Sequence, residues 1–307
     1  MSAAGLMCTL VVLYGNEQPS FRAGVEQVTV GVSVRLRDPR VPLGELSASD
    51  LRILEDGVAQ TITHFVRDRR PVSMVIALDS STSMAGEAQE LAAQAARALF
   101  GSLNPEEEVS LVTFAGYPIV PMHWSRVGDT PGIDWPQWVV PGNTAMFDAL
   151  VASLGLMDEA SHQRRVIVLV SDGFENASGR PLRELVTTRR QSETEVYAIR
   201  TNPPEVPPGQ VRHPVLSPRP AGPRLPGVDY MREVVGDSGG LAFDAPSTDF
   251  TNAAVLGVIA NLRSQYLVGY QTRRPLDGTY RRIKVEARSR DIQVRHRGGY
   301  LAFPARP

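Results

Sequence analysis

Residues 72–79 read VSMVIALD, and residues 80–84 continue the chain as SSTSM. The first stretch is a nearly continuous apolar run, which is typical of a strand buried on both faces of a parallel sheet. It ends in the carboxylate of Asp79, and the hydroxyls of Ser81 and Ser83 follow at alternate positions. A turn after a strand usually contains Gly, Pro or a single Asx residue. Three hard oxygen donors at this spacing indicate a cation site instead.

The middle of the chain repeats this strand pattern. Three further apolar segments follow, and they read VSLVTF (109–114), RVIVLVSD (165–172) and EVYAIRT (195–201). Helix-like stretches separate them, at Glu87–Leu103, Ala145–Glu159 and Leu182–Gln191. Alternating strands and helices predict an α/β fold with a doubly wound, mainly parallel sheet. Ligands of such sheets lie beyond the carboxyl ends of the strands, where we expect both Asp79 and Asp172.

Both ends of the chain alternate apolar and polar residues, which is typical of half-buried strands. The pattern is present in VTVGVSVRLRD from Val28, in LRILEDGVAQTITHF (51–65) and in three segments after residue 264. We therefore expect β segments over residues 21–69 and 265–307 to pair into one small β-sandwich. An α/β domain over residues 70–264 is then inserted between them. The arginine-rich run at 281–297 is interpreted as the solvated face of the last strands.

Two segments lie outside this plan. Residues 202–227 contain nine prolines and no periodic apolar residues, which predicts a surface loop or an extended insert. Residues 1–20 contain the apolar run Leu6–Tyr14, which is too short to cross a bilayer but has the length of a signal-peptide core. No Lys or Arg precedes that run, so a buried strand is the alternative. We expect a leader, no transmembrane span, and a secreted, periplasmic or cell-envelope protein.

The composition excludes several classes of partner and site. The 307 residues include 32 Lys and Arg against 33 Asp and Glu, and this balance gives no sign of a nucleic acid partner. Cys8 is the only cysteine, which excludes an intramolecular disulfide and a cysteine-based zinc site. The sequence leaves the oligomeric state open.

Two later segments add oxygen donors to those of the first strand. PGNTAMFDAL (141–150) places Thr144 at the start of a helix, and VLVSDG (168–173) ends a strand in Asp172. Mg²⁺ prefers six hard oxygen ligands and keeps several waters, so two carboxylates and three hydroxyls suit Mg²⁺ or Mn²⁺ better than Zn²⁺. Each segment by itself is also compatible with Ser and Asp acting as helix caps and turn residues.

Together, DSSTS (79–83), GNTAMFDAL (142–150) and VLVSDG resemble the metal-ion-dependent adhesion site of the von Willebrand factor type A domain. The flanking stretches ELSASDLRILEDGVAQTITHF, GGLAFDA and LRSQYLVGYQ, with RHRGGYLA, are similar to exported bacterial proteins of the "von Willebrand factor A-related" type. The resemblance covers about residues 21–302. Two departures are the proline-rich insert and Thr82, where such proteins often have a Gly with free φ.

This resemblance implies a role for each donor and a function for the chain. The carboxylate of Asp79 and the hydroxyls of Ser81, Ser83 and Thr144 would bind Mg²⁺ or Mn²⁺, with Asp172 as a second carboxylate acting through water. The protein would then be a metal-dependent binding or adhesion module whose ion binds an Asp or Glu of a protein partner. A structural or scaffolding envelope protein with an inactive metal site is the alternative.

Enzyme functions rank lowest. Residues 236–240 read GDSGG, the string around the nucleophile of chymotrypsin-like proteases, but no His has a matching context and the preceding chain is α/β. We interpret this string as a helix stop and a turn. Haloacid-dehalogenase-like hydrolases need a second Asp two residues after the first, and Ser81 occupies that place. We therefore predict no enzymatic activity, with a hydrolase as the most distant alternative.

Overall fold

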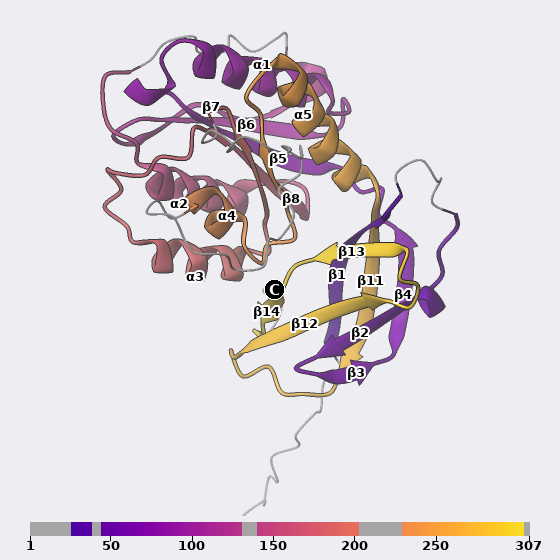
Figure 1. The fold of residues 1–307 in the computed structure, drawn as a ribbon. Helices are drawn as coiled ribbons and strands as arrows, with labels where there is room; N and C mark the ends of the chain where they lie inside the picture. Colours follow the sequence, from indigo (N-terminus) through magenta and orange to yellow (C-terminus); the bar gives the residue numbers. More distant parts are fainter. Residues whose placement is uncertain (1–25, 39–43, 131–139, 203–228, 304–307) are drawn as a thin grey trace, which may run out of the picture.

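The computed structural model describes residues 26–38, 44–130, 140–202 and 229–303. The expected leader at 1–20, and the proline-rich insert apart from its first residue, lie outside the described residues. Figure 1 shows an α/β domain beside a smaller all-β domain, and the chain passes between them at β4 and again after α5. Within the described ranges, no helix combines the length and apolarity that a membrane crossing requires.

A six-stranded sheet forms the centre of the α/β domain, in the order β10-β9-β8-β5-β6-β7. Its strands are β5 (Val72–Asp79), β6 (Glu108–Phe114), β7 (Pro118–Arg126), β8 (Arg164–Ser171), β9 (Glu195–Arg200) and β10 (Ala242–Asp244). All neighbouring pairs are parallel except β6 and β7. β5 lies between β8 and β6, and all eight of its residues are buried. The predicted mainly parallel α/β sheet is confirmed.

Helices cover both faces of this sheet. The α-helices are α1 (Glu87–Gly101), α2 (Met146–Leu156), α3 (Leu182–Ser192), α4 (Tyr230–Val235) and α5 (Thr248–Arg263), and short 3-10 helices span Ala48–Asp50, Thr82–Met84, Val127–Asp129 and Met157–Glu159. α1 and α5 pack on one face, and α2, α3 and α4 on the other (Figure 1). Met74 and Ile76 of β5 join the first core, and Val75 and Ala77 join the second. β5 therefore has no solvent face, which explains its continuous apolar sequence.

The two ends of the chain form a β-sandwich of two four-stranded sheets, in the orders β13-β1-β11-β4 and β14-β12-β2-β3. The strands are β1 (Glu26–Leu36), β2 (Leu51–Glu55), β3 (Val58–Gln60), β4 (Ile62–Arg67), β11 (Gln265–Thr272), β12 (Tyr280–Ala287), β13 (Ile292–His296) and β14 (Gly299–Leu301). Each sheet contains strands from both ends; β1, for example, pairs antiparallel with β11 and β13. The domain limits assigned at residues 70 and 264 stay predictions.

A buried ion pair joins the two chain ends inside the sandwich. Arg281 on β12 is fully buried, Glu55 at the end of β2 is 1% exposed, and Arg281 Nη1 lies 3.4 Å from Glu55 Oε1. Glu55 also accepts hydrogen bonds from the hydroxyls of Tyr270 (2.6 Å) and Tyr300 (3.2 Å). The expectation of a solvated basic face was therefore wrong at Arg281. This arginine shares the inward face of β12 with two apolar residues. Its carboxylate partner is on β2, which pairs with β12 in the sheet but is distant in the sequence.

Removal of the Glu55 carboxylate should destabilise the whole chain. Glu55→Ala leaves the buried Arg281 guanidinium with the exposed Asp277, at 3.7 Å, as its remaining ion-pair partner, and breaking a buried pair typically costs about 3–5 kcal/mol. Glu286→Ala is a control on β12, the strand of Arg281, because the ion pair of Glu286 with Lys284 is exposed to solvent and contributes little to stability. Urea denaturation measures both effects. Equal losses in the two variants would show that the buried pair does not hold the chain ends together.

The sequence pattern did not predict β7. Pro118 and Pro121 lie within this strand and would interrupt a central strand, but prolines are tolerated at the edge of a sheet. β7 pairs antiparallel with β6 through a short hairpin and has β6 as its one neighbour among the described strands. The hairpin lies at the carboxyl end of β6, close to the predicted cation site, and β7 runs from there back toward the start of β6.

Candidate metal site

Asp79 is placed by the register of the central sheet. It is the last residue of β5 and is level with Phe114, the last residue of β6. On the other side, Leu78 is level with Val170 of β8, so β8 also ends beside Asp79. The Asp79 side chain is almost fully buried, with 2% of the residue exposed. The carboxyl ends of three strands therefore meet around this carboxylate.

The loop after β5 brings two hydroxyls next to Asp79. The Ser81 N–H donates to Asp79 Oδ1 (2.9 Å), and Ser81 is the N-cap residue of the 3-10 helix Thr82–Met84. Ser81 Oγ lies 3.2 Å from Ser83 Oγ. Thr82, the departure from the usual Gly, adopts a negative φ, and its hydroxyl accepts a hydrogen bond from the Gly142 N–H (3.0 Å). The threonine thus ties this loop to the next one.

Thr144 reaches the same group from the second loop. Its hydroxyl donates to Ser81 Oγ at 2.9 Å, and both residues are buried. The Thr144 N–H donates to Asn176 Oδ1 (2.8 Å), and the Thr144 carbonyl accepts from the Asn176 N–H (3.0 Å). Asn176 follows Asp172 in the chain, so it links the second loop to the third. α2 begins at Met146, two residues after Thr144 rather than at it.

Asp172 completes the group from the end of β8. Its Oδ1 accepts a hydrogen bond from the Phe174 N–H (3.1 Å), whereas its Oδ2 is buried and has no hydrogen-bond partner among the described residues. A buried carboxylate oxygen without a donor is costly unless a cation or water satisfies it. Hydrogen bonds therefore connect Asp79, Ser81, Ser83 and Thr144. Asp172 lies at the end of the neighbouring strand, where its charge acts on Asp79, and one of its carboxylate oxygens has no hydrogen-bond partner among the described residues.

The electrostatics of the site also favour a bound cation. Burial raises the pKa of Asp79 to about 6, and the negative charge of Asp172 adds to this effect. Hydrogen bonds to Asp79 oppose the rise, including one of 2.6 Å from the Ser171 hydroxyl to Asp79 Oδ2. Two carboxylates in one buried region repel each other, and a divalent cation between them would remove that cost.

The donor set fits a hard divalent cation. The described residues form no group of three or more His, Cys, Asp or Glu side chains that could hold a metal ion, so no ligand cluster of the zinc type occurs among them. Two carboxylates and three hydroxyls are the ligands that Mg²⁺ and Mn²⁺ prefer. The set carries fewer negative charges than a typical calcium site. Its five oxygens leave at least one of the six coordination positions of Mg²⁺ for another ligand.

The sequence analysis missed the residues that support these donors. Ser171 bonds to Asp79 Oδ2, and Asn176 holds Thr144. Glu175 accepts from the Phe147 N–H (3.0 Å) at the start of α2 and from the Ser178 hydroxyl (2.7 Å). One signal was available, because Ser171 is a lone hydroxyl at the end of an otherwise apolar strand. The roles of Asn176 and Glu175 depend on contacts between loops that the local pattern does not show.

Two exposed aromatic side chains flank the oxygen donors. Phe174 is 58% exposed and follows β8, on one side of β5. Tyr117 is 68% exposed and lies in the β6–β7 hairpin, on the other side of β5. Both residues therefore follow strands that are adjacent to β5, at the edge of the sheet where Asp79 lies. Exposed aromatic residues of this kind are enriched where proteins bind each other.

The GDSGG string has a structural role. Ser238 is 7% exposed, and its hydroxyl accepts a hydrogen bond from the Val196 N–H (3.0 Å). A Cβ atom on Gly240 would lie 2.0 Å from the Val196 carbonyl oxygen, so only glycine fits there. His296 is near this turn, but its Nε2 accepts from the Val285 N–H and its Nδ1 contacts the Arg297 carbonyl. Neither residue is arranged as a nucleophile with its base.

Comparison with known families identifies the domain that carries the site. Residues 74–175 match the family model of the von Willebrand factor type A domain, and this span contains all five oxygen donors. The central region of the chain is therefore a von Willebrand factor type A domain. No curated protein matches the chain.

The chain is also similar to several solved structures at low sequence identity. An aerotolerance-related membrane protein from Bacteroides fragilis is 16% identical, with 62% of this chain and 98% of that chain covered and a TM-score of 0.43. BatB from Bacteroides thetaiotaomicron is 17% identical, with 63% and 100% covered and a TM-score of 0.43. A von Willebrand factor type A protein from Catenulispora acidiphila is 13% identical, with 92% and 64% covered and a TM-score of 0.42. Likeness at this level gives no information about function.

Asp79→Asn should stabilise the metal-free protein at neutral pH. The raised pKa of Asp79 means that its contribution to stability is intact below the ordinary value of 3.8 and is lost as the pH rises through about 6. The difference between these values corresponds to a cost of about 3 kcal/mol above pH 6. Urea denaturation in EDTA should therefore show a gain for the variant above pH 6, which shrinks toward pH 3.8. A loss of stability above pH 6 would contradict this account.

Proposed function

We propose that the chain is a metal-dependent protein-binding module that holds Mg²⁺ or Mn²⁺ at Asp79, Ser81, Ser83, Thr144 and Asp172. One observation carries this proposal: five oxygen donors from three loops converge at the carboxyl edge of the sheet, and the Asp172 Oδ2 among them is buried without a partner. Helix caps and turns alone would not leave a buried carboxylate oxygen unsatisfied.

Each of the five proposed ligand residues would have a distinct part in holding the ion. The Asp79 carboxylate supplies one negative charge, and the hydroxyls of Ser81, Ser83 and Thr144 supply neutral oxygens. Asp172 supplies the second charge, through water. The bound ion would add a positive charge that attracts an Asp or Glu side chain of a partner protein. Ser171 and Asn176 would keep these ligands in place through their hydrogen bonds.

Protein binding fits the surroundings of the site better than catalysis. The side-chain oxygens of the donors contact one another, the Ser171 hydroxyl or backbone N–H groups, and no histidine takes part in these contacts among the described residues. Metal-assisted hydrolysis would need a base beside a metal-activated water. Phe174 and Tyr117 instead present apolar area on both sides of the site, as a protein interface would.

Calorimetric titration of the full chain with Mg²⁺ and Mn²⁺ tests the metal site. We expect one saturable site in the wild type and none in Asp79→Ala. Ser171→Ala should weaken binding by about 10–100-fold, because it removes a group that orients a ligand. Asp291→Asn, a change of an exposed acidic residue in the sandwich, is the control and should leave binding intact. Wild-type affinity in Asp79→Ala would rule out this site, and absence of binding in the wild type would favour a scaffolding role.

Selection from a library of peptides with a central Asp or Glu tests the partner chemistry. Peptides that bind the wild type in Mg²⁺ should be released by EDTA, and their Asp→Asn or Glu→Gln versions should not bind. Apolar residues should be enriched beside the acid, and Phe174→Ser with Tyr117→Ser should remove that enrichment. Val58→Ser, at a residue of the sandwich that is 64% exposed, is the control. Binding that persists in EDTA would refute the proposed contact through the ion.

We further propose that this module acts outside the cytoplasm, in the periplasm, the cell envelope or the medium. The support is the apolar run near the N-terminus and the similarity of the flanking motifs to exported proteins. Fractionation of the native host tests this proposal, and recovery of the intact chain from the cytosol alone would contradict it.

A further inference from the structure

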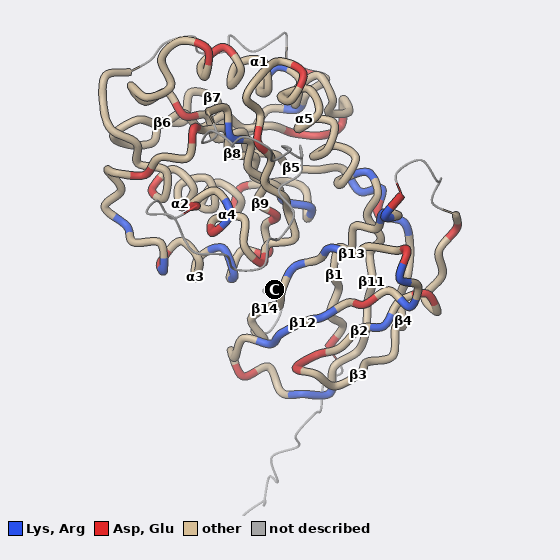
Figure 2. Tube along the Cα trace, in the orientation of Figure 1, with Lys and Arg blue, Asp and Glu red and all other residues tan. Residues whose placement is uncertain are grey.

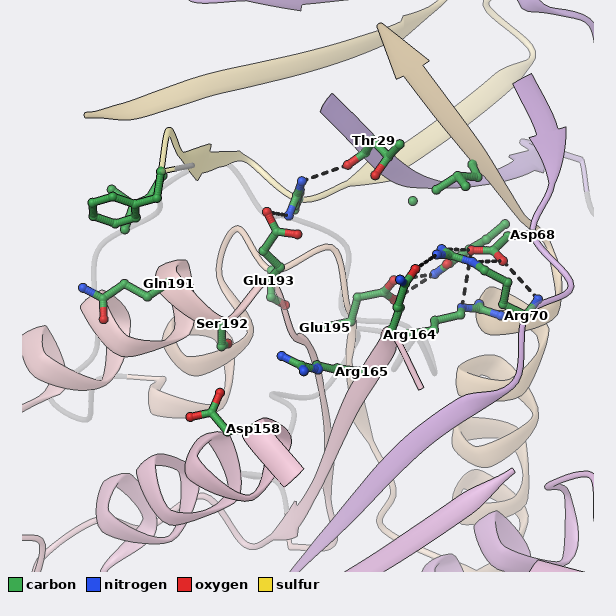
Figure 3. Close-up of a pocket in the computed structure, with 18 residues that line it drawn as sticks. Thr29, Asp68, Arg70, Asp158, Arg164, Arg165, Gln191, Ser192, Glu193 and Glu195 are labelled. Atoms are coloured by element: carbon green, nitrogen blue, oxygen red, sulfur yellow. Dashed lines mark hydrogen bonds and ion pairs between the residues drawn. The ribbon is translucent and has the colours of Figure 1, made fainter. Parts of the chain in front are cut away.

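A cavity lies at the edge of the central sheet opposite the candidate metal site, between the amino-terminal ends of the strands and the β-sandwich. Its volume is about 990 Å³, which is within the range of small-molecule sites. Residues at the starts of β8 and β9 and after α3 line one side, and residues of β1 and β11 line the other (Figure 3). Figure 2 shows acidic and basic residues on both domains where they face each other. The lining is therefore rich in charged groups.

Most of these charges already have partners. Asp68 accepts a hydrogen bond from the Arg70 guanidinium at 2.8 Å, and Arg164 Nε lies 3.9 Å from the same carboxylate. Arg297 pairs with Glu193 at 2.5 Å and donates to a backbone carbonyl of β1 at 2.8 Å. Each of these five residues has an ion-pair partner in the cavity wall, and because three arginines share two carboxylates the wall keeps a surplus positive charge.

The partly buried carboxyl group of Glu195 also has partners. It accepts hydrogen bonds from the Tyr197 hydroxyl (2.7 Å) and from the Gln265 side-chain amide (2.8 Å). Burial raises the pKa of Glu195, and the charge of Arg164 opposes that rise. The Glu195 carboxyl group is therefore held by groups of the cavity wall itself.

Arg165, in contrast to these residues, has no ion-pair partner among the described residues. It is the second residue of β8, level with Ser73 of β5, and Figure 3 shows its side chain pointing into the cavity. Its Nε is buried without a hydrogen-bond partner, and the structure gives its guanidinium no ion pair with a described residue. Asp158 also lines the cavity, but it is exposed to solvent and makes no bond to Arg165. One guanidinium thus remains available inside a polar cavity.

We propose that Arg165 binds the carboxylate or phosphate group of a small organic anion in this cavity. A guanidinium presents a planar fork of donors that matches both groups. Gln191 and Ser192 lie on the same side of the cavity and offer hydrogen-bonding groups for the rest of the ligand (Figure 3). The volume is far larger than an inorganic ion requires, so the natural ligand is an organic molecule that carries the anionic group.

Calorimetry of the full chain in EDTA, with phosphate and with citrate as probes, tests this site separately from the metal site. We expect at least one probe to bind, and the tighter of the two identifies the anionic group. Arg165→Gln should weaken binding by about 10–100-fold, the value of one hydrogen bond to a charged group. Arg165→Lys keeps the charge and should recover part of the affinity. Asp158→Asn should strengthen binding, because it removes a negative charge near the anion.

Arg183→Gln is the matched control. Arg183 lies on the exposed side of α3, so the variant changes the net charge by the same amount without reaching the cavity. Its affinity should stay within about twofold of the wild type, since exposed distant charges are screened. Binding of neither probe would overturn the proposal, and so would equal weakening by Arg165→Gln and Arg183→Gln.

Discussion

The buried position of β5 is the constraint on which the rest of the structure depends. Its eight residues have hydrogen-bonded neighbours on both sides and helices on both faces, so its register and direction are fixed. The one charged residue of the strand comes where the strand leaves the core, and that residue is Asp79. Because β6 and β8 end at the same level, the loops that follow all three strands are brought to one edge. A rigid apolar strand thus positions a polar site.

Burying the two carboxylates of the candidate metal site costs electrostatic free energy, whereas the buried carboxylate of the sandwich is paired with an arginine. In the sandwich, the buried Glu55 faces the buried Arg281 and two tyrosine hydroxyls. At the sheet edge, the hydrogen-bond partners of the buried Asp79 and Asp172 are hydroxyls and backbone N–H groups of the described residues. Uncompensated carboxylates of this kind persist where function requires them. A divalent cation would supply the compensation that Arg281 supplies in the sandwich.

Much of this arrangement could be predicted from the sequence, because it follows from local periodicity. Continuous apolar runs predicted β5, β6, β8 and β9, and alternating runs predicted strands at the chain ends that the structure pairs. The strand ends also indicated Asp79 and Asp172 before their neighbours were known. The edge strand β7 was missed because its two prolines look like loop residues. Ser171, Asn176 and the Arg281–Glu55 pair were missed because their partners are distant in sequence.

The central claim is that the oxygen donors at this edge hold a divalent cation. A crystal structure of the chain grown with Mn²⁺, measured at a wavelength where manganese scatters anomalously, tests it most directly. The account predicts one strong anomalous peak surrounded by the side chains of Asp79, Ser81, Ser83, Thr144 and Asp172, and no such peak in crystals of Asp79→Ala. An ordered site with water alone among these side chains, in crystals where Mn²⁺ binds elsewhere or not at all, would contradict the claim.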